Sequence, residues 1–449
     1  MSRVVKSPVQ ANSVSASETR LGERLRYLRA AAEMTQTELA GDRFSKEYLS
    51  QIERGKTKPT RETLEWLAAR LSVDADFLVS GVSVEERGRV EAALARSEAL
   101  NEAHRYQDAL AEFAEVRRSV AATGASDLQV RALSGEGWAL AQEGQVRDAI
   151  DLLDRARNLV ESAVFSDVDR ADILFRLGVC RYKLSSVSTA IALFNEALAL
   201  ADSSELPCDH LRSSILGWRS RCWRRQRDFE AAREDVERAL ELGEGLKDRR
   251  SLADVYLQAS LIAERQGRWI LARSYAERAK AQCEEIADLT SVGKLLNNLG
   301  GLSFLLDKPE EAAAYLKDAF RVALEVGNDV DAAYAVSSLA QVLLRTGEID
   351  QAESQARHAL KLLGGRVEFI DEIGNAQLVL GRALLEQGRL PEADAELKRA
   401  DKSFAQLSSV SHRAAAWVAQ GDLAARRGDD ANAARLYRNA AEALQDFRF

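Results

Sequence analysis

Residues 45–55 read Ser-Lys-Glu-Tyr-Leu-Ser-Gln-Ile-Glu-Arg-Gly, and this stretch decides how the N-terminal part of the chain folds. At helical spacing its three apolar side chains, Tyr48, Leu49 and Ile52, share one face, while the polar and charged ones point the other way. The serine that opens the stretch can cap the first turn through its hydroxyl, and the closing glycine suits the left-handed position after a helix. The stretch therefore predicts a short helix with an outward polar face, the kind of face that reaches base edges in a DNA major groove.

The segment just before it predicts a second short helix. Thr35 and Glu38 have the spacing of a capping box, in which each side chain satisfies a backbone N–H of the other residue. A helix is therefore expected to begin here and to continue through Ala40. Two short helices joined by a few residues, the second with the outward polar set, form a helix-turn-helix. Lys56 and Lys58 follow the second helix and are placed to lie along phosphates.

The distribution of charge favours contact with a nucleic acid. The whole chain has 62 Lys and Arg against 70 Asp and Glu. Residues 1–81 contain 13 of these cations and 11 of these acids, net +2, so the remainder has 49 and 59, net −10. Six cations gather between residues 43 and 61, against only Glu47 and Glu53. A basic cluster in an acidic chain is typical of phosphate binding, and a merely solvated amphipathic helix is the alternative.

Leu21 to Leu78 resembles the five-helix DNA-binding domain of phage-repressor-like (Cro/cI, XRE-type) regulators, also called lambda-repressor-like. The matching stretches are LGERLRYLRAAAEMTQTELA, SKEYLSQIERGKTKP and TLEWLAARLSVDADFL. The turn at residues 41–44 is one residue shorter than in that family. The resemblance implies that Gln36 anchors a phosphate, that Arg54 and Lys56 face phosphates, and that the outward residues of the second helix face bases. With the neighbouring positions, the candidate DNA-binding residues are Thr35, Gln36, Arg43, Ser45, Lys46, Glu47, Tyr48, Ser50, Gln51, Arg54, Lys56 and Lys58.

Length and composition limit the possible folds of the whole chain. A chain of 449 residues with few Pro and few aromatic residues, rich in Ala, Leu, Glu and Arg, predicts an all-α protein of several domains or a repeat array. No apolar run reaches the ~20 residues of a membrane span. Four cysteines make no disulfide framework and indicate a reducing cytoplasm. Residues 1–17 are expected to be a disordered arm, and residues 18–81 the helix-turn-helix domain, beginning with a helix over 18–32.

From about residue 85 the sequence repeats every 40 to 42 residues. A small residue lies twelve positions before each recurring alanine, and five of the nine units have Gly five positions before it. Each unit is expected to be two amphipathic helices joined by a tight turn, stacked because one hairpin cannot bury its apolar face alone. The recurring alanines are Ala109, Ala149, Ala190, Ala232, Ala272, Ala312, Ala352, Ala393 and Ala433.

This pattern, clearest at Leu177, Gly178 and Ala190, resembles the tetratricopeptide repeat, which implies a right-handed α-solenoid of about nine repeats over residues 85–446. Its period exceeds the usual ~34 residues, so longer helices are expected. The first helix of each pair would line a concave ligand groove. The resemblance implies inward positions six and three residues before the small residue, and one, four and five after it. These positions give the groove candidates Arg131, Tyr182, Arg221, Arg224, Arg225, Asn297, Phe304, Tyr334, Gln341, Asn375 and Arg382.

Two features of the groove indicate its ligand. Asn297 offers both a donor and an acceptor and can pair with an extended peptide backbone. The arginines between residues 219 and 227 form a basic patch, which suits a carboxylate or an acidic peptide. A solvated groove wall or ion pairs within the array are the alternative for any single residue. The four tryptophans of the later repeats (Trp218, Trp223, Trp269 and Trp417) are interpreted as packing residues.

No catalytic or metal-binding constellation emerges. The four His are scattered, and Cys208 and His210 have the spacing of only two ligands of a metal site. We therefore predict a non-enzymatic, cytoplasmic bacterial transcription regulator without a cofactor. It would bind double-stranded DNA, take a peptide or protein ligand in the repeat groove, and act as a homodimer through the apolar C-terminal end (Leu444, Phe447 and Phe449). The alternatives are a tetratricopeptide adaptor whose helix-turn-helix domain serves protein interaction, and an antitoxin-like repressor.

Overall fold

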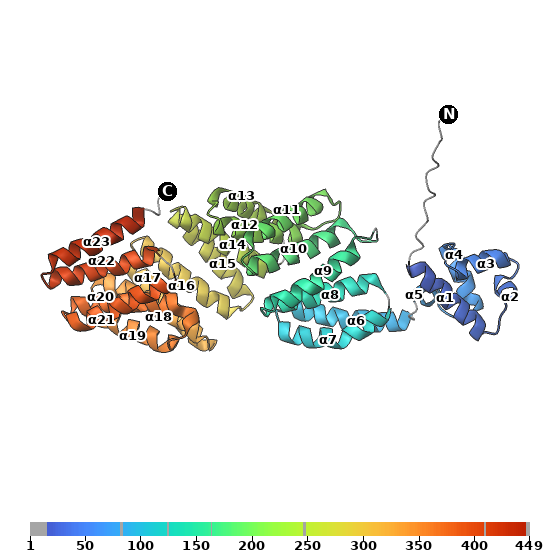
Figure 1. Cartoon of the computed structure of the whole chain (residues 1–449), viewed down its shortest axis with the longest axis horizontal. Helices are drawn as coiled ribbons and strands as arrows, with labels where there is room; N and C mark the ends of the chain where they lie inside the picture. The colour runs from blue at the N-terminus through green and yellow to red at the C-terminus, as the bar shows by residue number, and fades with distance from the viewer. Residues whose placement is uncertain are drawn as a thin grey trace, which may run out of the picture. The chain divides into compact units, whose positions relative to one another are not determined.

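The computed structural model describes residues 16–445, apart from 81–83, 124, 163, 246–247 and 408–409. The described part is helical, with 23 α-helices and one short 3₁₀ turn (Figure 1). None of its helices is both long enough and apolar enough to cross a membrane. Most of the expected N-terminal arm, the start of the linker after Ser80, and both Phe447 and Phe449 lie outside the described residues.

Five helices form the N-terminal domain, and the capping predictions for them are confirmed. Thr35 and Glu38 make both hydrogen bonds of the capping box, and these bonds lower the pKa of Glu38. Ser45 Oγ accepts from Tyr48 N at 3.1 Å, and Gly55 has a φ of 66°. The first helix begins two residues earlier than expected. The bounds are α1 (Ala16–Ala31), α2 (Gln36–Ala40), α3 (Lys46–Glu53), α4 (Arg61–Arg70) and α5 (Ala75–Ser80).

The core of this domain packs α3 tightly against α1. The fully buried leucines and isoleucine come from all five helices: Leu25, Leu39, Leu49, Ile52, Leu67 and Leu78. Gly22 of α1 lies directly on the end of α3, because a Cβ at this position would come within 2.5 Å of the Glu53 carbonyl oxygen. Only glycine permits this approach, so the orientation of α3 depends on the backbone contact at Gly22.

Nine helix pairs follow in the described residues, as the repeat pattern predicts. The chain divides into two compact units, residues 1–206 and 207–449. The first unit contains the pairs α6 (Val84–Glu102) with α7 (Tyr106–Thr123), α8 (Ser126–Gln142) with α9 (Val146–Val160), and α10 (Asp167–Lys183) with α11 (Val187–Ser203). The second unit contains α12 (Asp209–Arg225) with α13 (Phe229–Gly243), α14 (Arg249–Arg265) with α15 (Trp269–Glu285), α16 (Leu289–Leu305) with α17 (Pro309–Glu325), α18 (Asp329–Thr346) with α19 (Ile349–Leu363), α20 (Ile370–Glu386) with α21 (Leu390–Gln406), and α22 (Val410–Arg426) with α23 (Asp430–Gln445).

The two helices of each pair are matched through small and large side chains. All nine recurring alanines are buried, eight of them completely. Where the small residue is Gly, a Cβ there would come within about 3 Å of the large side chain four positions after the alanine, as at Gly178 against Phe194 (2.6 Å) and Gly300 against Leu316 (2.6 Å). Where it is Ala340, that position holds only an alanine, Ala356. Each glycine therefore makes room for a large partner on the second helix.

The turn inside each pair has the same backbone conformation throughout the array. The five glycines expected to permit the turn all have positive φ, between 72° and 85°. The four units without Gly have positive φ as well, at His104, Ser185, Arg227 and Asp307. A residue with a Cβ is strained in this region. The shape of the hairpin thus imposes the turn even where the local sequence disfavours it.

Candidate DNA interface and repeat groove

Helix α3 presents an exposed polar face. Lys46, Glu47 and Gln51 are exposed on it, whereas Ser50 and Tyr48 are half-buried. The Tyr48 ring packs on Phe44 of the preceding turn, with ring centroids 5.5 Å apart. Of the candidate base-facing residues, these three exposed ones and Ser45 at the helix start are therefore the most accessible.

A buried carboxylate joins the first three helices. Arg29 Nε of α1 donates to Glu53 Oε1 at 2.6 Å, and Gln36 Nε2 of α2 donates to Glu53 Oε2 at 2.7 Å. Arg29 also donates to the Met34 carbonyl at 2.8 Å. The Glu53 side chain is only 4% exposed, although the charge count treats it as a surface acid. This network fixes α3 relative to α1 and α2, and it leaves the carbonyl oxygen of the Gln36 amide for other partners.

Two other candidate residues have partners within the domain. Arg43 forms an ion pair with Glu62 of α4 and lies over the Phe44 ring, 5.8 Å from its centroid. Gln51 Oε1 accepts from the Thr57 hydroxyl at 2.9 Å. The Arg43 charge is thus compensated in the free protein. The Thr57 contact leaves the amide NH₂ of Gln51 as its outward donor.

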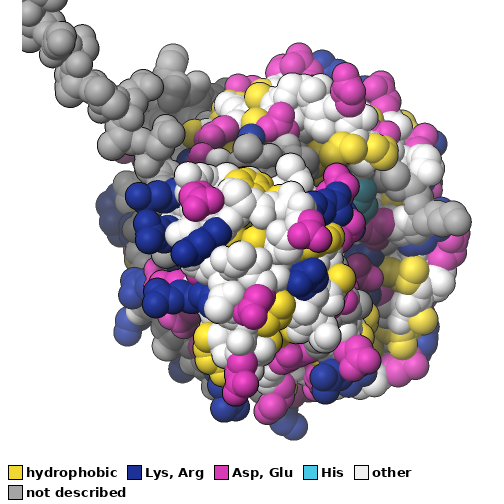
Figure 2. Space-filling model, turned by 90° about the vertical axis from the view of Figure 1, so that its right-hand side faces the viewer, with side chains coloured by type: hydrophobic (Ala, Val, Ile, Leu, Met, Phe, Trp, Pro, Cys, Tyr) yellow, Lys and Arg dark blue, Asp and Glu magenta, His cyan; other side chains and the backbone are white. Residues whose placement is uncertain are grey.

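Four exposed cations surround α3: Lys46, Arg54, Lys56 and Lys58. None of the four forms an ion pair with a residue that the structure describes. Figure 2 shows that Lys and Arg side chains gather toward one side of the visible face, where acidic ones are fewer. Because Glu53 is buried and neutralised, the surface near α3 is more positive than the count of residues indicates.

In the second unit, the first helix α12 contacts α14, and α16, α18, α20 and α22 contact one another in succession; the surface of these first helices is here called the inner face. Ten buried side-chain N or O atoms in the described residues have no hydrogen-bond partner, and all ten belong to first helices of pairs. The second helices contribute none. Buried polar groups are normally paired, so the first helices, in both units, are the part of the described array in which internal pairing is least complete. The residues are Asn101, Ser134, Gln142, Arg221, Arg224, Gln258, Asn297, Ser303, Ser337 and Arg382, of which Ser337 also lies close enough to Glu372 to interact with its carboxyl group.

Four of the predicted groove residues belong to this set, and all four are in the second unit. Asn297 Oδ1 is buried without a donor near the middle of α16. The Nε atoms of Arg221 and Arg382 are buried without an acceptor, and the Nε atom of Arg224 is buried in a side chain that has an interaction elsewhere. Gln258, which is 4% exposed and also carries an unpaired Oε1, is an additional inner-face residue that the sequence reading missed. It lies two positions before the small residue, outside the inward register that the resemblance implies.

Other predicted groove residues already have partners within the array. Arg131 forms a two-bond ion pair with Glu98, at 2.7 and 3.0 Å. Phe304 is covered by the Arg345 guanidinium, 4.8 Å from the ring centroid. Tyr182 is half-buried, whereas Arg225 and Gln341 are exposed. For the paired residues, pairing within the array is the simpler role.

Tyr334 and Asn375 belong to an acidic, aromatic end of the inner face between α18 and α20. Asn375 Nδ2 donates to Glu372 Oε2 at 3.4 Å, and the Tyr334 ring meets Phe369 edge to face at 6.5 Å. Burial raises the pKa of Glu372, and burial followed by the charge of Asp371 raises the pKa of Tyr334. Both shifts favour the protonated forms, which can donate hydrogen bonds.

The basic patch of α12 is smaller than expected. Arg219 donates two hydrogen bonds, at 2.5 and 2.7 Å, to Asp235 of α13, whose side chain is 8% exposed. Arg219 therefore fastens the two helices of one pair and is not available to a ligand. Arg221 remains on the inner face, over the Trp218 ring at 4.4 Å and 3.3 Å from Asp254 of α14.

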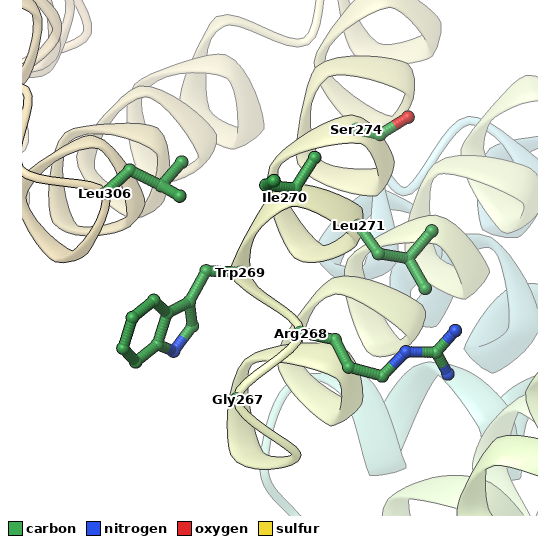
Figure 3. A pocket seen from close by; sticks show the side chains of 7 residues that line it. All are labelled: Gly267, Arg268, Trp269, Ile270, Leu271, Ser274 and Leu306. Carbon is green, nitrogen blue, oxygen red and sulfur yellow. The ribbon is translucent and has the colours of Figure 1, made fainter.

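A shallow, open pocket of about 490 Å³ has none of the predicted groove residues in its lining (Figure 3). It is lined by the turn before α15, by the first residues of α15 and by Leu306. Trp269 is 40% exposed and Ile270 is 79% exposed, so the interpretation of Trp269 as a packing residue is wrong in part. Other units have a polar or small residue at the position of Ile270, for example Glu230 and Glu310.

The structure does not support metal or thiol chemistry in the residues it describes. No group of His, Cys, Asp and Glu side chains there could hold a metal ion, and His210 is paired with Asp248 at 2.7 Å. The four cysteines are buried, and none of them forms a disulfide. Burial raises the pKa of Cys180 to about 11 and that of Cys222 to about 12. These two thiols are therefore protonated and poorly reactive at neutral pH.

Comparison with protein families identifies the two modules. Residues 20–77 match a helix-turn-helix domain. Residues 291–363 match one tetratricopeptide repeat family, and residues 153–205, 338–408 and 378–446 match another. No curated protein sequence matches the chain. The chain is thus an all-α protein with a helix-turn-helix domain at its N-terminus and tetratricopeptide repeats after it.

Solved structures share this fold at low sequence identity. The apo form of RapI has a TM-score of 0.65 and 11% identity, covering 80% of this chain and 98% of RapI. The apo form of the quorum sensor NprR from B. thuringiensis has a TM-score of 0.60 and 12% identity, covering 80% and 99%. A Rap protein complexed with competence and sporulation factor has a TM-score of 0.50 and 16% identity, covering 79% and 99%. At these identities the likeness establishes the fold.

Proposed function

We propose that the protein is a sequence-specific DNA-binding transcription regulator whose repeat array binds a peptide or protein ligand that controls DNA binding. The proposed DNA binding rests on one observation: four exposed cations without ion pairs to the described residues surround α3, which is capped and has its polar face on the surface. A groove-reading helix needs such a polar face, and the flanking cations neutralise phosphates. In this arrangement Lys46 and Gln51 read bases, while Arg54, Lys56 and Lys58 position the domain.

The structure of α3 favours particular base contacts. Lys46 presents only donors, and Gln51 presents its NH₂ because Thr57 occupies its carbonyl oxygen. Donors on the protein match the single acceptors of adenine (N7) and thymine (O4) in the major groove, and both acceptors of guanine (N7 and O6). We therefore propose that these two side chains read guanine best, and that Gln36 and the α2 N-terminus contact a phosphate.

The ligand half of the proposal depends on the inner face of the second unit. A run of first helices there carries buried polar atoms without partners, and an extended peptide can supply both the donors and the acceptors that they need. RapI and the quorum sensor NprR share the fold. By analogy, the array would sense a signalling peptide, and the protein would act in the cytoplasm.

Regulation would operate through a homodimer. A dimeric helix-turn-helix protein places two reading helices in half-sites about 34 Å apart, or a multiple of this distance. A ligand that binds one curvature of the array better than another shifts the population toward that curvature. The spacing of the two DNA-binding domains would change with it. The C-terminal helix α23, where Leu444 is 46% exposed, remains our candidate for the dimer contact.

The DNA half is tested by gel shift of the full-length protein on fragments of its own promoter region, over a salt series. We expect a specific complex whose log affinity falls with log salt by roughly 0.9 per phosphate neutralised. Lys46→Ala and Gln51→Ala should each lose about 1–3 kcal/mol of discrimination between the preferred and a changed base. Lys317→Ala, an exposed lysine on α17, is the control that should not differ from wild type. Full retention of sequence choice in both α3 variants would show that another element reads the DNA.

A scaffold function is the second candidate, and the pocket at Trp269 favours it. An apolar surface that includes a tryptophan and a largely exposed isoleucine is suited to a protein partner. In that case the helix-turn-helix domain serves a protein contact as well. A full-length protein that retains no duplex DNA at low ionic strength, but captures a protein partner that Ile270→Glu releases, would favour this alternative.

A further inference from the structure

The unpaired polar atoms of the inner face differ in kind along the second unit. Arg221 of α12 and Arg382 of α20 each have a buried Nε–H without an acceptor. Between them, Gln258 of α14 and Asn297 of α16 each have a buried amide oxygen without a donor. In chain order, these four side chains are a donor, two acceptors and a donor; Arg224, Ser303 and Ser337 lie on first helices of the same unit and also have buried polar atoms.

Arg382 is the clearest example of a side chain that lacks a partner within the described part of the array. Other arginines on first helices have carboxylate partners, for example Arg131 with Glu98 and Arg426 with Glu386. Arg382 is half-buried, yet it has no ion pair and no hydrogen bond with any residue that the structure describes. A partly desolvated guanidinium without a counter-charge is unfavourable. A carboxylate from a ligand would relieve this cost through charge-assisted hydrogen bonds.

Arg221 also has donors without partners among the described residues, but the case for a ligand is weaker because it already has one ion-pair contact. Its guanidinium lies on the Trp218 ring and has one contact with Asp254, at 3.3 Å between Nη2 and Oδ2. The Arg221 side chain is 19% exposed, and the Asp254 side chain is 60% exposed. The stacked ring holds the planar guanidinium in place. One long contact to an exposed carboxylate leaves most of its five donors for another acceptor.

The two amides need the opposite partner. Gln258 Oε1 and Asn297 Oδ1 accept hydrogen bonds, and because both oxygens are buried in the free protein, the backbone N–H groups of an extended peptide would donate to them once the side chains turn outward. Gly301, one helical turn from Asn297, has nothing within 4 Å of the position of a Cβ, so the surface beside the amide is open. A peptide backbone can therefore approach the middle of the inner face.

We infer that the ligand is an extended peptide with a carboxylate near each end of the bound segment, one on Arg221 and one on Arg382, with its backbone N–H groups on Gln258 and Asn297. This inference rests on the proposed peptide-sensing function and specifies the chemical class of the ligand. For helices packed about 8–10 Å apart, four steps from α12 to α20 span roughly 40 Å. An extended chain advances about 3.3 Å per residue, so a separation of about 12 residues between the two carboxylates matches this span.

The test uses the full-length protein and an array of defined 12-residue peptides on a surface. All peptides share the same set of neutral central sequences. They have Glu at both ends, Glu at one end, Gln at both ends, or Lys at both ends, and all are C-terminally amidated so that only the side chains differ in charge. We expect retention to be strongest for Glu at both ends, about tenfold weaker for one Glu, and weakest for Lys.

Substitution of each arginine tests whether it binds a carboxylate of the peptide. Arg382→Gln and Arg221→Gln should each weaken binding of the peptides with two Glu by about tenfold, and each should leave binding of the Gln-ended peptides unchanged. Arg438→Gln, an exposed arginine on α23, is the matched control and should behave as wild type. Thermal unfolding of each variant, compared with wild type, checks that the array is intact.

The outcomes separate the two proposals. Retention of peptides without any preference for acidic ends, or an unchanged preference in both arginine variants, would overturn the inference and leave peptide sensing in place. Failure of every peptide to bind the folded wild-type protein would overturn peptide sensing itself, and the inference with it.

Discussion

The match between small and large residues in each repeat makes a quantitative prediction at Gly300. An alanine Cβ at this position would lie 2.6 Å from Leu316 Cγ and 2.7 Å from its Cδ2. Leu316 is 1% exposed and cannot move into solvent. Gly300→Ala should therefore destabilise the α16–α17 pair by about 1–3 kcal/mol, the usual cost of overpacking a core.

The neighbouring glycine is a control of the same chemistry. Gly301 lies in the same helix, and nothing is within 4 Å of the position of its Cβ. Gly301→Ala should stabilise the helix by about 0.5–1 kcal/mol, because alanine has the better helix propensity. The two adjacent substitutions should thus have opposite signs.

A second substitution should compensate for the first. Leu316→Ala alone should cost about 2–5 kcal/mol because it leaves a cavity. In the double variant the new methyl group fills part of that cavity, as Ala340 and Ala356 do in the seventh repeat, where both are fully buried. We expect the double variant to be more stable than the sum of the single effects by roughly 1–3 kcal/mol.

Local hydrogen exchange of the full-length protein is the suitable assay, because a long repeat array does not unfold in a single cooperative step. Protection of the α16 and α17 amides reports the free energy of opening for this pair, while protection in the helix-turn-helix domain is the internal reference. Additive effects of the two substitutions, or equal effects of Gly300→Ala and Gly301→Ala, would refute the argument from packing.

Three further predictions follow from individual residues. Ser185→Gly should raise the free energy of opening of the α10–α11 pair, measured by hydrogen exchange, by roughly 0.5–1 kcal/mol, because it relieves the strain of a φ of 63°; weaker protection of these helices would contradict this. Burial raises the pKa of Cys222 to about 12 from its ordinary 9.0, so the stability that this thiol contributes is complete below pH 9 and falls as the pH rises toward 12. Iodoacetamide at pH 8 should label Cys222 only after unfolding. Rapid labelling of the folded chain would disprove its burial. Arg43→Ala should weaken DNA binding less than Lys56→Ala in a filter-binding assay, since Arg43 is already paired with Glu62, and the reverse order would show that DNA displaces that pair.

Local signals in the sequence predicted most of the fold. The capping box at Thr35, the cap at Ser45, the glycine after α3 and the nine-fold alanine pattern all act within one or two helical turns, so they can be read from neighbouring residues. They were sufficient to place the helices of the N-terminal domain and to count the repeats.

The errors concern charged residues whose partners are distant along the chain. Glu53 has the position of a surface acid at the end of an amphipathic helix, and it is buried only because Arg29, 24 residues earlier, reaches it. Arg219 appears in a basic run, but its partner Asp235 is 16 residues further on, in the other helix of the pair. No period in the sequence encodes such contacts. The unpaired Oε1 of Gln258 was missed for the same reason, since only tertiary packing decides which atoms remain without partners.

The network at Glu53 limits how the N-terminal domain can change shape. Removing one partner from a buried ion pair typically costs about 3–5 kcal/mol, and here Arg29 and Gln36 bind the same carboxylate from two other helices. Tilting α3 alone would break these bonds and the close backbone approach at Gly22. The three helices therefore move as one rigid piece. Under the proposed function, an effector would act by repositioning or releasing the whole domain, and not by bending α3.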